Sequence, residues 1–443
     1  MNDWPQNWTR PIDAGYTDAS LVYSNVHQAR PAFVASVGNV TEVQKALSYA
    51  RSEGLAVAVR GGGHSLAGLS SIAGGVVIDL RKLNGIEPAE SSGEFWIGGG
   101  TLAGKVAGYL GDRALAVPLG DSSAVGIGGI TLGGGTGWLT RKFGLTLDTL
   151  TAAEITLADG STSIVDASNN PDLFWALRGG GGNFGVVTRL RFRPHPLAQV
   201  LGGTLTLPLT AQNLQRAIDT IDAAPEELGV IALAMRPPDA PAADPILMLT
   251  LVWSGDMLAG ERVVAQLRAI ASPTGEDISE MPYAGMYRFA LGEPPTITNA
   301  TENMFADLLD GAGLAAVVDA ANAPSVEGVF SVVEIRILGG AMARVPVHAT
   351  AFAHRERKLS ISVVRVGFPI DRYDEHRAWV SEAAEPLRHL RKGMYLNFVE
   401  HRDAMAASLV FPDATAARLA AVKQAVDPHN MFARNLPLPS LAR

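Results

Sequence analysis

The residues of this chain best suited to chemistry follow a short run of glycines. Arg60-Gly-Gly-Gly-His-Ser65 comes directly after a predicted strand at 55–60. Glycine backbone can cradle a phosphate because no side chain stands in the way, and an imidazole nitrogen such as that of His64 can attack an electrophilic carbon. Taken alone, the segment favours a tight turn with a surface histidine, so a ligand site here needs support from other segments.

Two more glycine-rich segments supply part of that support. They span residues 126–137 and 179–185, in the same half of the chain as His64. Glycine loses more conformational entropy on folding than any other residue, so a glycine-dense folded segment needs a reason. Tight turns are one reason, but three such runs within one unit favour backbone that lies against a ligand.

Other catalytic patterns are present only in part. Gly180–Gly185 matches GxGxxG, but a predicted helix precedes it and a predicted strand follows it, which reverses the order of a dinucleotide fold. Gly63–Ala67 lacks the second glycine of a serine-hydrolase elbow. The nine histidines show no metal-binding spacing, so we expect no metal site. The absence of cysteine excludes disulfides and cysteine nucleophiles.

The composition indicates a globular protein of more than one packed unit. The 443 residues are 47% hydrophobic and 18% charged, and acids and bases are mixed along a chain of net charge −8. Without a basic patch, we expect no nucleic acid or membrane partner. The N-terminus lacks the regions of a signal peptide, and no apolar run reaches the roughly 18 residues of a membrane span. We therefore expect a cytoplasmic protein.

Apolar periodicity divides the chain into two α+β halves. Thr41 and Gln44 are predicted to form a capping box at the start of the first helix. The first half has predicted strands at 33–37, 55–60, 75–80, 95–97, 154–157 and 186–192, and helices at 41–53, 101–110 and 172–178. The second half has predicted strands at 202–207, 229–235, 246–253, 329–337 and 358–366, and helices at 210–223, 258–271, 371–391 and 415–426.

At five places, in order, the chain resembles the berberine-bridge-enzyme-like oxidases of the vanillyl-alcohol-oxidase/p-cresol-methylhydroxylase (PCMH) flavoprotein superfamily. The matching segments are 60–65, 120–135, 172–187, 395–398 and 427–432. The resemblance, nearer to the bacterial 6-hydroxynicotine-oxidase-like members, implies an α+β fold. A two-part FAD-binding domain of the PCMH type would occupy 1–198 and 393–443. A substrate domain with a large antiparallel sheet backed by helices would occupy 199–392.

The resemblance also implies roles for individual residues. His64 matches the histidine bonded to the flavin 8α carbon, and Tyr395 and Asn397 match a Tyr-x-Asn pair beside flavin and substrate. The other implied FAD contacts are Arg60, Gly61, Gly62, Gly63 and Ser65 around the pyrophosphate, Gly120, Asp121, Ser122, Val125, Gly126 and Gly129 along the ring, Val186 and Val187 near the adenine, and Gly182 and Asn435.

Three positions depart from the pattern of many relatives. Ser122 stands where they have a cysteine that forms a second bond to the flavin, so FAD is expected to be covalent through His64 only. Val125 occupies a position associated with oxygen access, where a small aliphatic side chain is typical of oxidases. Phe398 replaces a tyrosine that, if it is the base of those relatives, leaves this role to another group.

The implied activity is that of an FAD-dependent oxidase. It would take hydride from a C–H bond next to O or N of a small molecule and pass the electrons to O2, giving H2O2. A flavin-dependent oxygenase or cyclase and a non-catalytic flavin-binding protein remain alternatives. We expect a monomer or homodimer, with a small-molecule substrate and O2 as its partners.

Candidate substrate contacts are fewer and less specific. Tyr395 and Asn397 are the first candidates for catalysis. Glu334 and Arg336 alternate onto one face of the strand at 329–337, which favours a salt-bridged sheet face over substrate contacts. His354 and Tyr287 are weaker candidates for the pocket, and the alternative for His354 is an exposed strand end.

Overall fold

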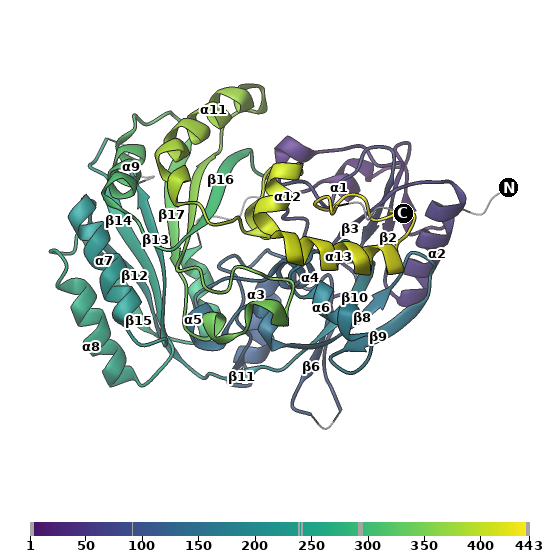
Figure 1. Ribbon diagram of the computed structural model, residues 1–443, viewed down its shortest axis with the longest axis horizontal. Coiled ribbons are helices and arrows are strands. Elements are labelled where there is room, and N and C mark those ends of the chain that lie inside the picture. The colour runs from purple at the N-terminus through teal and green to yellow at the C-terminus, as the bar shows by residue number, and fades with distance from the viewer. Residues whose placement is uncertain (1–3, 91, 238–239, 241, 291–295, 440–443) are drawn as a thin grey trace.

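Two sheet-based units lie side by side in the molecule (Figure 1). The computed structural model describes residues 4–90, 92–237, 240, 242–290 and 296–439. The N-terminal unit carries a four-stranded and a five-stranded sheet, and the second unit carries one seven-stranded sheet. This architecture confirms the predicted α+β class.

The four-stranded sheet is mostly parallel and has the order β1-β2-β4-β3. The register places Val76 of β4 opposite both Phe33 and Val57. Their side chains pack against Val43 and Leu47 of helix α2, which covers the sheet. The elements are β1 Trp8–Thr9, α1 Tyr16–Ser20, β2 Phe33–Ser36, α2 Val40–Ser52, β3 Val57–Arg60 and β4 Val76–Asp79.

The start of α2 differs from the predicted capping box. The helix begins at Val40, and the side chain of Asn39 accepts a hydrogen bond from Glu42 N at 3.0 Å. Asparagine caps a helix at least as well as threonine, so the cap lies two residues earlier than Thr41. Gln44 instead donates to the Gly160 carbonyl at 2.9 Å, which shows that the predicted Thr41–Gln44 pair is wrong.

The five-stranded sheet is antiparallel, with the order β5-β6-β10-β8-β9. Helix α6 precedes the glycine run at 179–185 and β10 follows it, so the order opposite to a dinucleotide fold is confirmed. The elements are β5 Ile86–Pro88, β6 Phe95–Gly98, α3 Ala103–Gly111, β7 Leu115–Ala116, α4 Ile127–Gly133, α5 Thr140–Phe143, β8 Leu150–Thr156, β9 Thr162–Asp166, α6 Pro171–Leu177, β10 Val186–Phe192 and β11 His195–Pro196.

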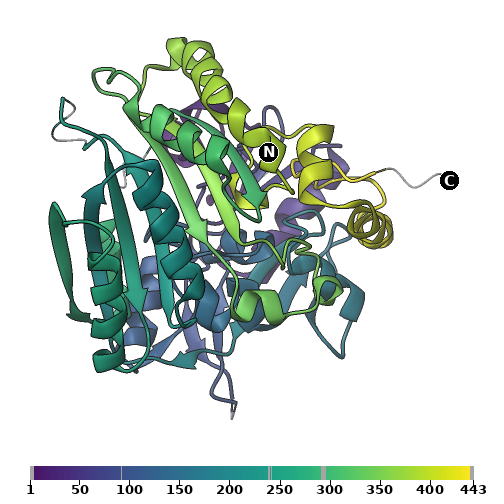
Figure 2. The same cartoon turned by 60° about the vertical axis from the view of Figure 1, so that its left-hand side comes forward.

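The seven-stranded sheet is antiparallel, with the order β15-β12-β14-β13-β17-β18-β16. Helices α7, α8, α9 and α11 cover one of its faces (Figures 1 and 2). The other face is turned toward the N-terminal unit. The elements are β12 Val200–Pro208, α7 Ala211–Ala223, β13 Leu228–Met235, β14 Ile246–Trp253, α8 Met257–Arg268, β15 Gly275–Met281, β16 Asn299–Ala306, α9 Gly311–Asn322, β17 Phe330–Ile337, α10 Ala341–Arg344, β18 Leu359–Val366 and α11 Tyr373–Ala384.

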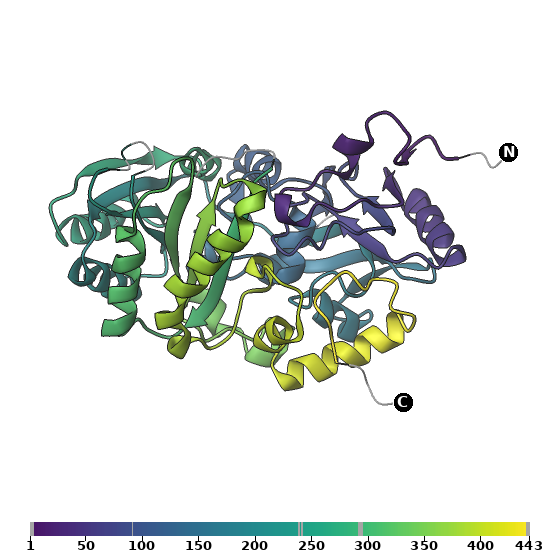
Figure 3. The ribbon, with the colours of Figure 1, turned by 90° about the horizontal axis from the view of Figure 1, so that it is seen from above.

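The last helices, α12 (Ala404–Val410) and α13 (Asp413–Val426), return to the N-terminal unit (Figure 3). Leu419 and Val422 of α13 share a core with Leu173 of α6. No single helix in the described part of the chain is long and apolar enough to cross a membrane; α12 and α13 reach that length and composition only as a pair, bent by 106°.

Candidate functional site

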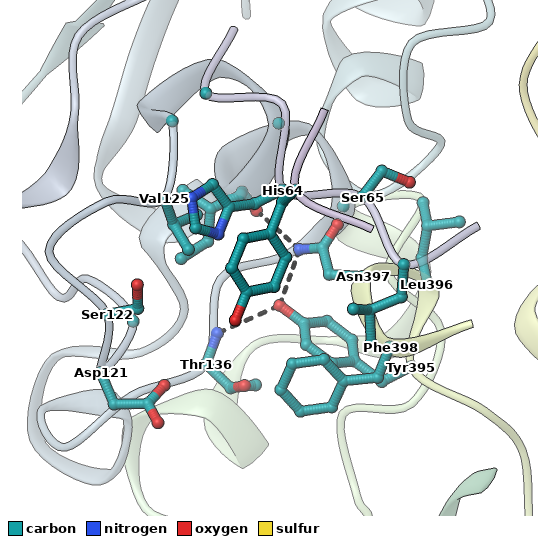
Figure 4. A pocket seen from close by; sticks show the side chains of 18 of the residues that line it. His64, Ser65, Asp121, Ser122, Val125, Thr136, Tyr395, Leu396, Asn397 and Phe398 are labelled. Atoms are coloured by element: carbon teal, nitrogen blue, oxygen red, sulfur yellow. Dashed lines mark hydrogen bonds between the residues drawn. The ribbon is translucent and has the colours of Figure 1, made fainter. Parts of the chain in front are cut away.

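A cavity of about 470 Å³ separates the glycine segments from the open face of the seven-stranded sheet. Side chains alternate along the strands, so Ile231 and Leu233 of β13 line the cavity while Ala232 packs toward the helices. The predicted FAD contacts that line it are Gly61, Gly62, Gly63, His64, Ser65, Gly120, Asp121, Ser122, Val125, Gly126, Gly129, Gly182, Val187 and Asn435. The structure thus brings most of these distant residues together (Figure 4).

His64 is held in the cavity wall by its neighbours (Figure 4). Gly63 has a φ of +79°, a left-handed conformation that glycine adopts without strain. The Gly63 carbonyl accepts a hydrogen bond from Tyr23 N at 3.0 Å, and the Tyr23 ring stacks on the imidazole with a centroid distance of 4.2 Å. Ser65 Oγ accepts from Leu69 N at 3.1 Å. These hydrogen bonds and the stacked ring of Tyr23 therefore fix the loop, with His64 in the cavity wall.

Arg60 and Val186 do not line the cavity, contrary to expectation. The Arg60 guanidinium is buried beneath the loop, where it pairs with Asp79 at 2.8 Å and donates to the Leu21 carbonyl at 3.0 Å. Burial lowers the pKa of Arg60, although Asp79 opposes this. Arg60 therefore ties the loop to β4. Val186 points into the core beside Phe33, because side chains alternate along β10 and its neighbour Val187 takes the cavity side.

Glycine is needed in the cavity wall for two different physical reasons. A Cβ on Gly62 would lie 2.4 Å from Gly126 N, and one on Gly126 would lie 2.2 Å from Gly62 N. These two glycines are required because one backbone touches another. Gly129 differs, since it lines the cavity and a Cβ there would meet no atom within 4 Å. The space beside Gly129 is room for a ligand.

The residues of the cavity fit an FAD. The first-turn N–H groups of α4, at Gly128 and Gly129, have no acceptor within their own helix and suit a pyrophosphate. The apolar side chains that suit an adenine are Val59, Leu80 and Val187. Two buried polar atoms of the lining, Ser70 Oγ and Asn299 Nδ2, have no hydrogen-bond partner among the described residues, which is expected of a site that receives a polar ligand.

Three N–H groups at the cavity wall donate hydrogen bonds to Tyr395 Oη (Figure 4). The donors are Gly135 N at 2.8 Å, Thr136 N at 3.2 Å and Asn397 Nδ2 at 2.9 Å. Asn397 Nδ2 also donates to the Ile130 carbonyl at 3.1 Å, so its N–H groups are committed to the protein. Burial raises the pKa of Tyr395 although these bonds lower it, so the phenol stays protonated at neutral pH. A phenol that keeps its own proton at neutral pH cannot take a substrate proton.

Arg336 of β17 joins the sheet to the glycine wall. Its Nη2 donates to both oxygens of Asp121 at 2.9 and 3.0 Å, its Nε donates to Glu334 Oε1 at 2.7 Å, and its Nη1 donates to the Thr136 carbonyl at 3.3 Å. Burial disfavours the charged guanidinium, but Asp121 and Glu334 outweigh it and raise the pKa of Arg336. Burial also raises the pKa of Glu334.

The interpretation of β17 was therefore half right. Glu334 and Arg336 do form the predicted ion pair on one face of the strand. That face is not a solvated surface, because both residues line the cavity. The sequence pattern gives the alternation along the strand, but it does not show which layer the polar face meets.

His354 and Tyr287 are absent from the lining among the described residues. His354 lies in the core behind Tyr395, beside Phe305, and its Nε2 contacts the Val410 carbonyl at 3.1 Å. Neither the predicted pocket position nor the exposed strand end is correct for it. Burial lowers the pKa of His354 to about 4. The Tyr287 hydroxyl donates to the Gly120 carbonyl at 3.2 Å and supports the loop from outside.

Many lining residues were not predicted from the sequence, among them Tyr23, Thr136 and Trp138. Thr136 Oγ1 and Trp138 Nε1 are buried and have no hydrogen-bond partner among the described residues. Thr136 and Trp138 flank the end of a glycine-rich run, which was a usable signal, whereas Tyr23 stands in a segment without any motif. In the described part of the chain, no group of three or more His, Asp or Glu residues could hold a metal ion.

Comparisons with known proteins agree with this site. Residues 31–166 match the FAD binding domain family. The (R)-6-hydroxynicotine oxidase of Paenarthrobacter nicotinovorans is 30% identical over 278 residues, which are 62% of this chain and 60% of that protein. An FAD-linked oxidoreductase of Bacillus subtilis is 38% identical over 193 residues, 42% of this chain and 43% of that protein. The chain thus matches less than two thirds of the length of these curated relatives.

Solved structures match nearly the whole chain. The 6-hydroxy-D-nicotine oxidase of Arthrobacter nicotinovorans has a TM-score of 0.88 at 24% identity and covers 99% of this chain and 100% of its own. A berberine-bridge-enzyme-like protein of Physcomitrella patens has a TM-score of 0.88 at 24% identity, covering 98% and 97%. These similarities establish the fold, and with the FAD binding domain they confirm the resemblance seen in the sequence. The chain therefore carries an FAD binding domain and has the fold of the 6-hydroxynicotine oxidase and berberine-bridge-enzyme-like structures.

Proposed function

We propose that this chain is an FAD-dependent oxidase of small organic molecules. It would take hydride from a C–H bond next to O or N and pass the electrons to O2, giving H2O2. The observation that carries the proposal is the single cavity that joins the His64 wall to the polar face of β17, so that cofactor and substrate would share one enclosure. When bound, FAD supplies the acceptor for two electrons and the site of reaction with O2.

The cofactor would be bonded to the protein through His64 alone. The Tyr23 ring fixes the imidazole in the cavity wall, and Ser122 in the facing loop has a hydroxyl that cannot form a thioether. Acid precipitation tests this proposal. Yellow colour should stay in the pellet for the native protein and for Ser122→Ala, and should move to the supernatant for His64→Ala. Native flavin in the supernatant would show that the bond does not exist.

Glu334 is the group that we assign to the substrate proton. It lines the cavity, it keeps acceptor sites beyond those used by Arg336, and the rise in its pKa by burial brings a carboxylate closer to the range of a useful base. The O–H or N–H proton of the substrate would pass to the Glu334 carboxylate while the C–H hydrogen leaves with its electron pair. Tyr395 would act as a positioning residue, because its oxygen anchors the backbone of Gly135 and Thr136.

A peroxide-coupled screen of alcohols and amines tests the reaction itself. One H2O2 per substrate oxidised, with no label from 18O2 in the product, supports the oxidase. Label in the product would replace it with an oxygenase on the same scaffold. A yellow protein that no compound of the screen bleaches under anaerobic conditions would indicate a flavin-binding protein without catalysis.

A further inference from the structure

The ring of Tyr23 covers one face of the His64 imidazole. The two ring centroids lie 4.2 Å apart, and the ring planes are only 15° from parallel. Both side chains line the cavity, and both are half-buried. The nitrogens of an imidazole lie on its edge, so a stacked ring limits the tilt of the imidazole without covering the atom that would form a bond. Tyr23 therefore restricts the direction in which the nitrogens of His64 point.

The backbone around Tyr23 is itself held from two sides. Tyr23 N donates to the Gly63 carbonyl at 3.0 Å, and the Tyr23 carbonyl accepts from Ile297 N at 2.7 Å. Asn25 N donates to the Ile297 carbonyl at 2.8 Å, so the pairing extends to both sides of the buried Ser24. The first of these bonds leads to the histidine loop, and the others lead to the residues just before β16. The Tyr23 ring thus has a fixed base from which to hold the imidazole.

A ring stacked on a histidine is not by itself a sign of function. Phe143 stacks on His195 with a centroid distance of 4.1 Å and an angle of 7° between the planes, and both of these residues are also half-buried. The described lining of the cavity contains neither of them. The stack of Tyr23 on His64 differs by its position in the cavity wall, at the histidine to which we assign the bond to the flavin.

Formation of that bond demands more of the geometry than binding of FAD does. The imidazole of His64 loses its N–H proton, the 8α methyl group loses a hydrogen as a proton, and an N–C bond forms between the two. The two electrons that this step releases pass through the flavin to O2, which takes up two protons and gives H2O2. The nitrogen must approach the carbon at close range and in the right direction, which a freely rotating imidazole would seldom do. The orientation of His64 should therefore change the rate of bond formation more than it changes the affinity for FAD.

We propose that Tyr23 is the positioning residue for covalent attachment of the flavin at His64, and that its ring acts by stacking on the imidazole. The proposal rests on the single bond through His64 proposed above. It adds that a residue of the N-terminal segment, outside the glycine-rich loops, sets the rate at which the bond forms. The aromatic face of Tyr23 carries this role, and its hydroxyl is not required.

The acid-stable share of the bound flavin tests this role without requiring a substrate. Full-length protein is isolated from cells harvested at successive times after induction, and the flavin that precipitates with the protein in acid is divided by the total bound flavin. Tyr23→Phe keeps the ring and should match the native protein, in which the share is nearly complete from the first harvest. Tyr23→Leu removes the aromatic face, and its share at the first harvest should be roughly fivefold lower or less. Because the readout is a ratio, a change in total flavin content does not alter it.

Phe143→Leu is the matched control, because it removes a stack of similar geometry from a half-buried histidine outside the cavity, and it should keep the native share. A native share in Tyr23→Leu would overturn the role of Tyr23. An equal loss in Tyr23→Phe would also overturn it, since the hydroxyl would then carry the effect. Where Tyr23→Leu fails to fold, Tyr23→Met takes its place, and Tyr23→Phe can overturn the role by itself. Native flavin that acid releases would overturn the His64 bond, whereas acid-stable native flavin with an unaffected Tyr23→Leu would overturn the role of Tyr23 alone.

Discussion

The two walls of the cavity are built in different ways. The N-terminal wall is rich in glycine backbone, with Gly62, Gly126 and Gly129 where side chains would block contact or space. The sheet wall consists of side chains that alternate along strands, with Glu334 and Arg336 among both apolar and polar neighbours. Backbone N–H groups recognise the phosphates that many dinucleotides share. A single side chain of the sheet, in contrast, can be replaced without altering its strand. The difference suggests that the first wall keeps a constant cofactor and the second sets the substrate.

Replacement of a packing glycine should have the largest effect. Gly126 has φ −73° and ψ 133°, which valine adopts readily, so the cost of Gly126→Val would be steric. Its Cβ would lie 2.2 Å from Gly62 N, and we expect a loss of roughly 4 kcal/mol or more in the free energy of unfolding. Urea unfolding and flavin content of the purified protein measure the result.

Gly129→Ala is the matched control within the same wall. A methyl group there enters open space, so the protein should fold with near-native stability but with a reduced flavin content. Equal losses of stability in Gly126→Val and Gly129→Ala would show that glycine is not needed at these two positions for different physical reasons.

Loss of the Arg336 ion pairs, which link the two walls, should have the next largest effect on stability. Arg336→Met would leave Asp121 and Glu334 without their cation, and removal of one partner from a buried ion group typically costs about 3 kcal/mol. Arg268→Met breaks the half-exposed pair with Glu276 and should cost less than about 1 kcal/mol. Urea unfolding of both variants compares them, and similar losses would mean that the link contributes no more than a surface pair.

The contrast between the walls also explains what the sequence could predict. Each glycine run is contiguous, so the loop that ends at His64 can be located from local sequence, although its assignment to a ligand site needed the other glycine runs and the family resemblance. The Arg60 side chain was placed wrongly because its partner, Asp79, comes from a parallel neighbour in the sheet, and no local pattern reveals that pairing.

The sheet wall was harder to predict because it is assembled from strands far apart in sequence. Glu334 and Arg336 share a face by simple alternation, but their third partner, Asp121, is 215 residues from Arg336. Strand β16 was missed because Asn299, Glu302 and Asn303 give it a polar sequence although it is fully buried. These side chains are satisfied by tertiary hydrogen bonds, such as Asn303 Nδ2 to Ser362 Oγ at 3.0 Å, which periodicity does not show.

The free energy of unfolding should depend on pH because His354 is buried in the core behind Tyr395. His354 has a pKa of about 4 in the folded protein because it is buried, against an ordinary value of 6.5. Below pH 6.5 the unfolded chain binds a proton that the folded protein refuses, so stability is lost as the pH falls from 6.5 toward 4. The loss amounts to about 3 kcal/mol. The difference in unfolding free energy between native protein and His354→Gln should therefore shrink over this range; a constant difference would show that His354 does not titrate as described.

The hydroxyl of Tyr395 should give the smallest of these effects, and it tests whether the two walls are joined at a second point. Tyr395→Phe keeps the ring and leaves Gly135 N, Thr136 N and one Asn397 N–H bond without their acceptor. Each unmade buried hydrogen bond of this kind costs about 1–3 kcal/mol, but water from the adjoining cavity can replace the lost acceptor, so we expect a total loss below that of Arg336→Met. Tyr109→Phe, in a half-buried ring that packs on Phe95, should change stability by less than about 0.5 kcal/mol. If Tyr395 only positions the wall, flavin reduction in Tyr395→Phe should slow without a change in its pH profile, because the proton goes to Glu334. A pH profile that loses one ionisation would instead make the phenol the base.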